Sequence, residues 1–190
     1  MKKLSTYLFL IFFSFQTSSW SNDIQDFEVE GFSIGDSLLS YFTKEQIEKN
    51  FQDWYPGEPF RYFEFIGLKS LEIFDNIGFF IKKGDKNYKI LSITALILCL
   101  EDIKDCYKSR DEIDKELSVM YKNEKRTKKI EKYPDSERRG TNSKAMQIIY
   151  TFRSGDGIVL EIRDWGIDSD FGDNTAIHLD TKQMRDWLGI

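Results

Sequence analysis

Residues 88–100, YKILSITALILCL, form the most apolar stretch of the chain beyond its first twenty residues. The second half of the stretch is apolar at consecutive positions, which is typical of a strand that is covered on both faces of a sheet. Lys89, Ser92 and Thr94 interrupt the stretch, and it is too short to span a bilayer. It therefore predicts a central strand, around which the rest of the fold is arranged.

Shorter runs on both sides of this stretch have the alternating pattern of half-buried strands. They are residues 26–32, 60–67, 71–83 and 174–181, together with 145–165, where a Ser-Gly-Asp-Gly turn between two apolar runs predicts a hairpin. Most of these runs are joined by short turns rather than by helices. The sheet is therefore expected to be mostly antiparallel.

Helices are predicted where a capping box precedes an amphipathic run. Ser33 and Asp36 form the first box, and Thr43 and Gln46 form a second that begins a short helix ending near Asn50. The first predicted helix presents Ile34, Leu38, Tyr41 and Phe42 on one face.

The strongest helix signal lies in residues 104–123, where Ser109 and Glu112 form a third box. The face of this helix is expected to consist of Ile113, Leu117, Met120 and Tyr121. Residues 123–144 follow, with eight basic and four acidic residues, and are interpreted as a long exposed loop. A short helix is expected at 182–189.

Together these elements predict an α+β fold, with helices packed on a mostly antiparallel sheet in a single domain over residues 22–190. A weak internal echo sets residues 81–90 beside 152–161, each with a Gly-Asp turn. This similarity suggests that the domain arose by duplication and consists of two degenerate halves, each of which is a helix followed by three strands. Hairpin turns also look alike because of turn chemistry alone, so both interpretations stay open.

The N-terminus has the pattern of a cleaved signal peptide over residues 1–21. Lys2 and Lys3 precede an apolar run of about a dozen residues, and the small residues Ser19 and Ser21 occupy the −3 and −1 positions of a cleavage site. We therefore expect export to the periplasm, and no membrane-spanning segment in the mature protein.

The net charge and the cysteine content further limit the functional classes and the cellular compartment that fit this protein. Removal of Lys2 and Lys3 with the signal takes the formal charge from −5 to −7, which is unlike a general nucleic-acid binder. Cys99 and Cys106 would reach an oxidising compartment, where a structural disulfide between them is expected. Their spacing is not that of a C-x-x-C redox or zinc site, and two unpaired core thiols are the alternative.

Residues 35–38 are Gly-Asp-Ser-Leu, which resembles the nucleophile block of the G-D-S-L lipases and esterases. That resemblance implies an α/β fold, Ser37 as nucleophile and a D-x-x-H block carrying the base. The single histidine is His178, and Thr175 stands three residues before it where that family has Asp. We therefore expect no catalytic residue here, and keep a hydrolase that uses Ser37 and His178 as the alternative.

No metal or cofactor is expected. The acidic loop at Asp164, Asp168, Asp170 and Asp173 has the oxygen ligands that calcium prefers, but not the spacing of an EF-hand loop. Whether the loop around Asp168 and Asp170 binds calcium stays open. The 123–144 segment could contact an anionic partner, although its acidic residues dilute the positive charge.

Over most of its mature length the chain resembles a group of small exported proteins of marine alphaproteobacteria with AT-rich genomes. The residues that carry the resemblance are DIQDFEVEGFSIGDSLLSYF, NYKILSITALI, CYKSRDEIDKEL and LDTKQMRDWL. The group has no established activity, so the resemblance implies no site residues. The sequence favours a non-enzymatic periplasmic binding or envelope-associated protein, with a protein or small-molecule ligand.

Export predicts a defined mature N-terminus. Protein recovered from the periplasm should begin at Asn22, within a residue or two, because signal peptidase cuts after the small residue Ser21. Edman sequencing or intact-mass measurement decides the matter. Full-length protein retained in the cytosol would refute the assignment.

Overall fold

The computed structural model describes residues 24–99 and 101–190, and the predicted signal peptide lies outside them. The strands are β1 (Glu28–Val29), β2 (Phe32–Ser33), β3 (Phe51–Gln52), β4 (Phe60–Ile66), β5 (Asn76–Lys82), β6 (Ile90–Leu98), β7 (Lys125–Lys132), β8 (Lys144–Thr151), β9 (Gly157–Asp164) and β10 (Asn174–Asp180). The helices are α2 (Lys44–Lys49), α3 (Ile103–Met120) and α4 (Lys182–Leu188), with short 3-10 turns η2 (Ile24–Asp26) and η3 (Leu38–Ser40). The fold is mixed α+β and mostly sheet, as predicted.

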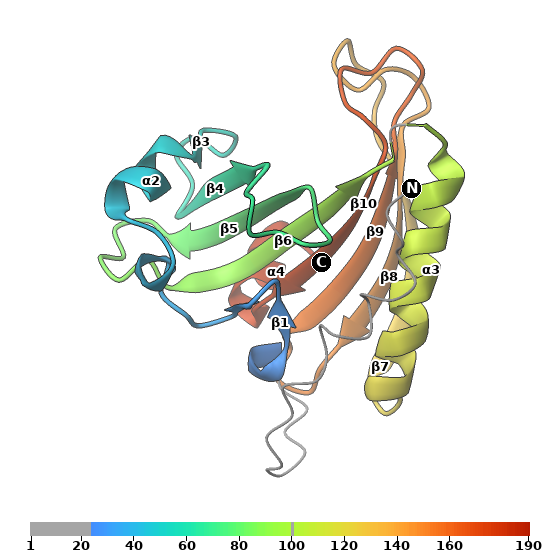
Figure 1. Cartoon of the computed structure of the whole chain (residues 1–190). Helices are drawn as coiled ribbons and strands as arrows, with labels where there is room; N and C mark the ends of the chain where they lie inside the picture. Colours follow the sequence, from blue (N-terminus) through green and yellow to red (C-terminus); the bar gives the residue numbers. More distant parts are fainter. Residues whose placement is uncertain (1–23, 100) are drawn as a thin grey trace.

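An eight-stranded antiparallel sheet in the order β3-β4-β5-β6-β10-β9-β8-β7 dominates the structure (Figure 1). Strand β6 lies near its middle, between β5 and β10. Ile93 and Ala95 on one face of β6 are fully buried, and Ser92 and Thr94 on the other are 1% and 6% exposed. Residues 88–100 therefore contain the central, doubly covered strand that the sequence predicts.

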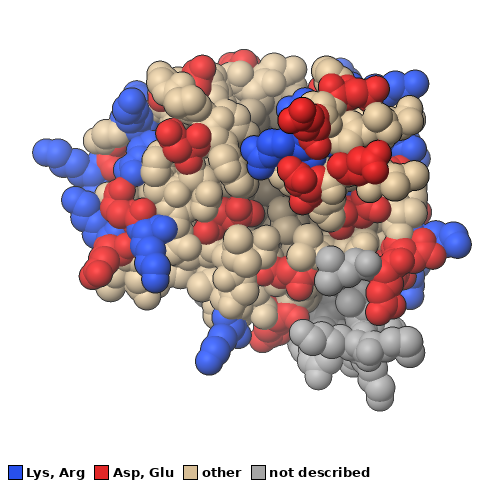
Figure 2. Space-filling model, turned by 90° about the horizontal axis from the view of Figure 1, so that it is seen from above, with Lys and Arg blue, Asp and Glu red and all other residues tan. Residues whose placement is uncertain are grey.

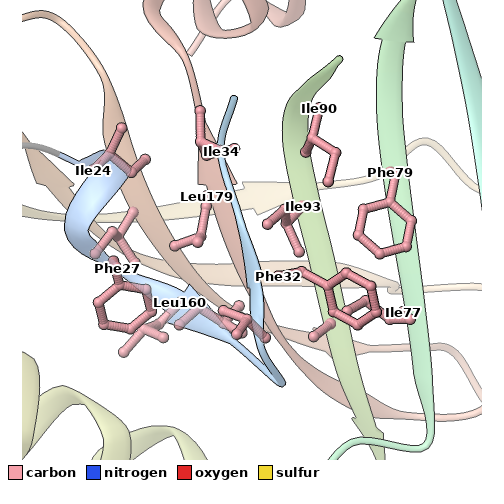
Figure 3. Packing of buried hydrophobic residues seen from close by; sticks show 14 of the residues in the cluster. Ile24, Phe27, Phe32, Ile34, Ile77, Phe79, Ile90, Ile93, Leu160 and Leu179 are labelled. Atoms are coloured by element: carbon pink, nitrogen blue, oxygen red, sulfur yellow. The ribbon is translucent and has the colours of Figure 1, made fainter. Parts of the chain in front are cut away.

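The first face of the sheet carries the main hydrophobic core. Helix α3 packs across β9 and β10, and Ile113 and Leu117 are buried there as predicted. The segment η2–β1–β2 covers the neighbouring part of the same face, where Phe27 and Phe32 lie over the strand residues (Figure 3). Burial of each large apolar side chain stabilises the fold by about 1.5–3 kcal/mol.

The opposite, second face carries α4, which lies behind the sheet in Figure 1. Thr181 caps its N-terminus and Gly189, with φ 74°, ends it in the left-handed conformation. Met184 is fully buried against an aromatic group that consists of Phe60, Tyr62, Phe80 and Trp187. The predicted terminal helix is confirmed.

The predicted helix at residues 33–42 is wrong. Gly35 has φ +95°, its N–H donates to the Ile90 carbonyl, and the Ile90 N–H donates to the Asp36 carbonyl. The backbone therefore bonds to the start of β6 instead of to itself, and only η3 is helical. The side chains of Ile34 and Leu38 are nevertheless buried in the core. The apolar spacing of these two residues therefore indicated buried positions correctly, although the segment is not a helix.

The Thr43–Gln46 capping box is confirmed at the start of α2, with both reciprocal hydrogen bonds present. The box predicted at Ser109 is wrong, because α3 begins earlier. Asp102 is its N-cap and accepts a hydrogen bond from the Lys104 N–H, and Ser109 lies buried in mid-helix.

The basic segment 123–144 is not a loop throughout. Lys125–Lys132 form β7, an edge strand paired with β8 along its whole length. Its side chains are almost all exposed on both faces, so no apolar alternation marks the strand in the sequence.

The Cys99 and Cys106 sulfurs lie at bonding distance, 2.10 Å, with Cα atoms 5.7 Å apart. The bond joins the end of β6 to the second turn of α3, where Cys106 is fully buried. It therefore holds the start of α3 against the sheet.

Reduction of this disulfide should destabilise the protein. A closed loop of this size suggests about 2–2.5 kcal/mol, or a fall in Tm of about 5–10 °C. Differential scanning calorimetry with and without dithiothreitol measures the change. The Cys99→Ser/Cys106→Ser variant should be insensitive to reductant; an equal Tm for oxidised and reduced wild-type protein would contradict a structural role.

Candidate functional site

Ser37 and His178 make separate contacts. The Ser37 hydroxyl donates to the Asn87 carbonyl and accepts from the Leu39 N–H as the N-cap of η3. The His178 ring instead contacts Thr94 and Glu161 on the second face of the sheet. The structure therefore does not join these two residues into a nucleophile–base pair.

His178 belongs to a group that we call the second-face polar cluster, formed by Thr94 (β6), Gln147 (β8), Glu161 and Arg163 (β9), and His178 (β10). The register brings the group together, because Thr94 is opposite His178 and Gln147 is opposite Glu161. The strand alternation that turns Leu160 and Ile162 into the core turns Glu161 and Arg163 to the other face.

Glu161 is the centre of the polar cluster, and its side chain is only 6% exposed. It accepts hydrogen bonds from Gln147 Nε2, at 2.6 Å, and from Arg163 Nε. His178 Nδ1 lies 3.0 Å from Thr94 Oγ1, whereas Nε2 is 3.9 Å from Glu161 Oε1, beyond hydrogen-bond distance. Buried atoms Gln147 Oε1 and His178 Nε2 have no hydrogen-bond partner among the described residues.

The charges in the cluster are well defined at neutral pH. Burial alone would raise the pKa of Glu161, but the charge of Arg163 and the hydrogen bonds bring that pKa below its ordinary value. Burial, assisted by the charge of Arg163, lowers the pKa of His178 to about 4, although Glu161 opposes the change. Glu161 is therefore ionised and His178 neutral at pH 7.

Aromatic side chains flank the cluster on two sides. Trp54 stacks on Tyr62 beside β4, with centroids 5.1 Å apart, and Tyr133 stacks on Trp165 beside β9 at 5.4 Å. Gly78 makes room for Tyr62, because a Cβ there would lie 2.0 Å from the Tyr62 hydroxyl oxygen.

Arg163 lies within electrostatic reach of both flanks. Burial raises the pKa of Tyr62 and of Tyr133, and the charge of Arg163 partly opposes each rise. The same charge partly opposes the rise that burial causes in the pKa of Glu64 on β4. Ionisable groups from both flanks of the cluster therefore lie within reach of the Arg163 charge.

A second buried polar group lies under α4. The Asp180 carboxyl, 1% exposed, accepts a hydrogen bond from Ser92 at 2.6 Å, and burial raises its pKa to about 6 although Ser92 and Arg185 oppose the rise. Arg185 itself donates to the carbonyls of Gly155 and Asp156, which ties α4 to the β8–β9 turn.

The carboxylates of the acidic loop do not lie together around one point. Asp164 pairs with Lys144 at 2.9 Å, Asp170 lies 3.9 Å from Arg138, and Asp173 accepts from the Trp165 N–H. No group of three or more metal-ligating side chains occurs within residues 24–99 and 101–190. The arrangement gives no support to a calcium site at Asp168 or Asp170.

Over the same described ranges, no helix is long and apolar enough to cross a membrane. Acidic and basic side chains are intermixed on the face seen in Figure 2.

The second-face polar cluster is not predicted by the sequence. The alternation of Glu161 and Arg163 with apolar residues was visible, and it places both on the polar face of a strand. It did not reveal that this face is itself covered, nor that Gln147 and His178 lie on neighbouring strands, because strand order does not follow from local pattern.

Comparison of the chain with models of protein families, with curated proteins and with solved structures found no match.

His178 and Asp180 give the stability opposite dependences on pH. The pKa of His178 falls from 6.5 to about 4 on folding, so its contribution is present above 6.5 and lost as pH falls through 4. The pKa of Asp180 rises from 3.8 to about 6, so its contribution is present below 3.8 and lost as pH rises through 6. Between about pH 4 and 6 the contribution of His178 to the stability rises with pH, whereas that of Asp180 falls.

Single substitutions should reveal how each of these two groups changes the free energy of unfolding with pH. Asp180→Asn should leave a stability that rises between pH 4.5 and 6 by up to about 1.4 kcal/mol per pH unit relative to wild type, and His178→Gln should show the reverse. Urea unfolding at three pH values measures both. Variant curves that run parallel to the wild-type curve would disprove the assignment.

Proposed function

We propose that the protein is exported and acts by binding a neutral, hydroxyl-rich ligand, such as a saccharide, at the second-face polar cluster. Five buried side-chain atoms of the described residues lack a hydrogen-bond partner, and the proposal rests on the two that lie beside the Glu161–Arg163 ion pair, Gln147 Oε1 and His178 Nε2. Buried polar atoms are normally hydrogen-bonded, so a pair left free on one sheet face is a feature that a ligand would explain.

The chemistry of the cluster selects the class of ligand. A hydroxyl group can donate to Gln147 Oε1 and accept from His178 Nε2 when that nitrogen carries the proton. The charges of Glu161 and Arg163 compensate each other, so the site favours a neutral molecule. The exposed ring of Trp54 offers an apolar face against which the C–H groups of a sugar can pack.

Export is supported by two independent features. The N-terminal residues have the pattern of a signal peptide, and Cys99 and Cys106 form a disulfide, a bond that persists in oxidising compartments. Both agree with a protein that works in the periplasm.

A hydrolase is the less favoured alternative. Ser37 has no contact with His178, and the hydroxyl that does meet the imidazole is that of Thr94, with Glu161 beyond it. In this hydroxyl–imidazole–carboxylate series, a histidine with a pKa of about 4 is a weak general base at neutral pH. The Glu161 carboxylate is held by Arg163 and Gln147 instead of orienting the ring.

The arrangement of the sheet supports a duplication, which we propose in a modified form. Each half consists of a helix, α2 or α3, followed by four antiparallel strands, and the last strands, β6 and β10, meet at the centre. In this scheme β5 corresponds to β9, so the Gly84 turn after β5 and the Gly155 turn after β8 are not equivalent. The proposed repeat therefore rests on topology and not on the Gly-Asp echo.

Ligand binding is tested by thermal shift and isothermal titration calorimetry of the purified protein against neutral mono- and oligosaccharides. A true ligand at one hundred times its Kd should stabilise the protein by about 2.7 kcal/mol. Gln147→Leu should weaken binding at least about tenfold, because it removes an acceptor that is unpaired in the free protein. The substitution also removes the Nε2 bond to Glu161, so a melting curve of the variant checks that the fold is kept.

The same substitution at an exposed position, Gln183→Leu on α4, is the matched control and should bind like the wild type. Failure of every saccharide to shift the Tm, or equal affinity in Gln147→Leu, would count against the proposal. Labelling by a fluorophosphonate probe that is lost in Ser37→Ala or Thr94→Val would favour the hydrolase.

A further inference from the structure

Strand β7 forms one end of the large sheet. It pairs with β8 from Lys125 opposite Thr151 to Lys132 opposite Lys144, and no strand of residues 24–99 or 101–190 pairs with its other edge. The edge is long, since eight residues are fully extended, and all but Glu131 are exposed. Such an edge presents backbone N–H and C=O groups to any strand that can approach it.

The side chains decide which strand can approach. The eight residues of β7 include five basic residues and one acidic residue, in a chain whose overall charge is −5. Arg126 is held by Asp114 at 2.6 Å and Lys129 by Glu131 at 3.0 Å. Lys125, Lys128 and Lys132 are exposed, and Ile130, which is 68% exposed, is the single apolar side chain among them.

A second copy of the chain is a poor occupant of this edge. Antiparallel pairing of β7 with itself would set lysines opposite lysines, and like charges directly opposite each other destabilise a sheet. An uncharged strand would gain no compensation for the positive charge. An acidic strand would gain a favourable opposite-charge pair at each facing lysine in addition to its backbone hydrogen bonds.

We propose that β7 is a docking edge that takes up an extended acidic segment of a partner polypeptide as a ninth strand of the sheet. Backbone pairing supplies affinity, and the lysines select acidic side chains at the facing positions. The competing view is that the lysines only protect the edge from aggregation. The two views differ in what they predict for an acidic peptide, because a purely protective edge binds none.

The probe is a fluorescein-labelled ten-residue peptide of alternating Glu and Val, titrated into the purified protein and followed by fluorescence anisotropy. Binding should weaken at least tenfold in Lys128→Glu/Lys132→Glu. It should be unchanged in Lys83→Glu/Lys86→Glu, which makes the same charge change at the exposed β5–β6 turn.

A peptide with the same sequence but N-methylated at alternate residues separates strand addition from simple charge attraction, because it keeps the charges and cannot complete the backbone ladder. It should bind at least tenfold more weakly than the unmodified peptide. Equal binding of the two peptides, no binding of either at low salt, or self-association of the protein that Lys128→Glu/Lys132→Glu alters would each overturn the proposal.

Discussion

The antiparallel pairing of β6 with β10 is the interaction on which the rest of the structure depends. It runs from Ser92 opposite Asp180 to Leu98 opposite Asn174, and within the large sheet it joins the four strands that precede α3 to the four that follow it. Without this pairing the chain would consist of two separate four-stranded sheets, each with an additional open edge. Because the two strands are far apart in sequence, the pairing is stabilised by cover on both faces, by α3 on one and α4 on the other.

The same pairing places polar side chains where they are buried. It sets Thr94 against His178 and Ser92 against Asp180, and the next strand adds Glu161. Burial shifts the pKa of His178 downward and that of Asp180 upward, so both groups favour their neutral forms. Such groups cost stability unless they are fully hydrogen-bonded, and Gln147 Oε1 and His178 Nε2 have no partner among the described residues, which is the observation behind the proposed ligand site.

The local elements that sequence predicts correctly are those whose signals are themselves local. The Thr43 capping box, the hairpin with its turn at Gly155, and the terminal helix capped by Thr181 each depend on residues a few positions apart. The errors occur where a distant segment supplies the hydrogen bonds. Gly35 bonds to Ile90 and so leaves the helix predicted around it, and the basic residues of β7 become a strand only because β8 is beside them.

By itself the sequence determined which side chains share a face in the strands that it predicts, where α2 and α4 begin, and that Cys99 and Cys106 are spaced to form a short bridge. It also determined that Glu161 and Arg163 lie opposite the apolar residues of β9. Only the tertiary structure decided that Glu161 meets Gln147 and His178, and that β7 ends the sheet. The physical reason is that strand order and register depend on the summed burial and hydrogen bonding of segments far apart in the chain, as for Thr94 and His178, which are 84 residues apart.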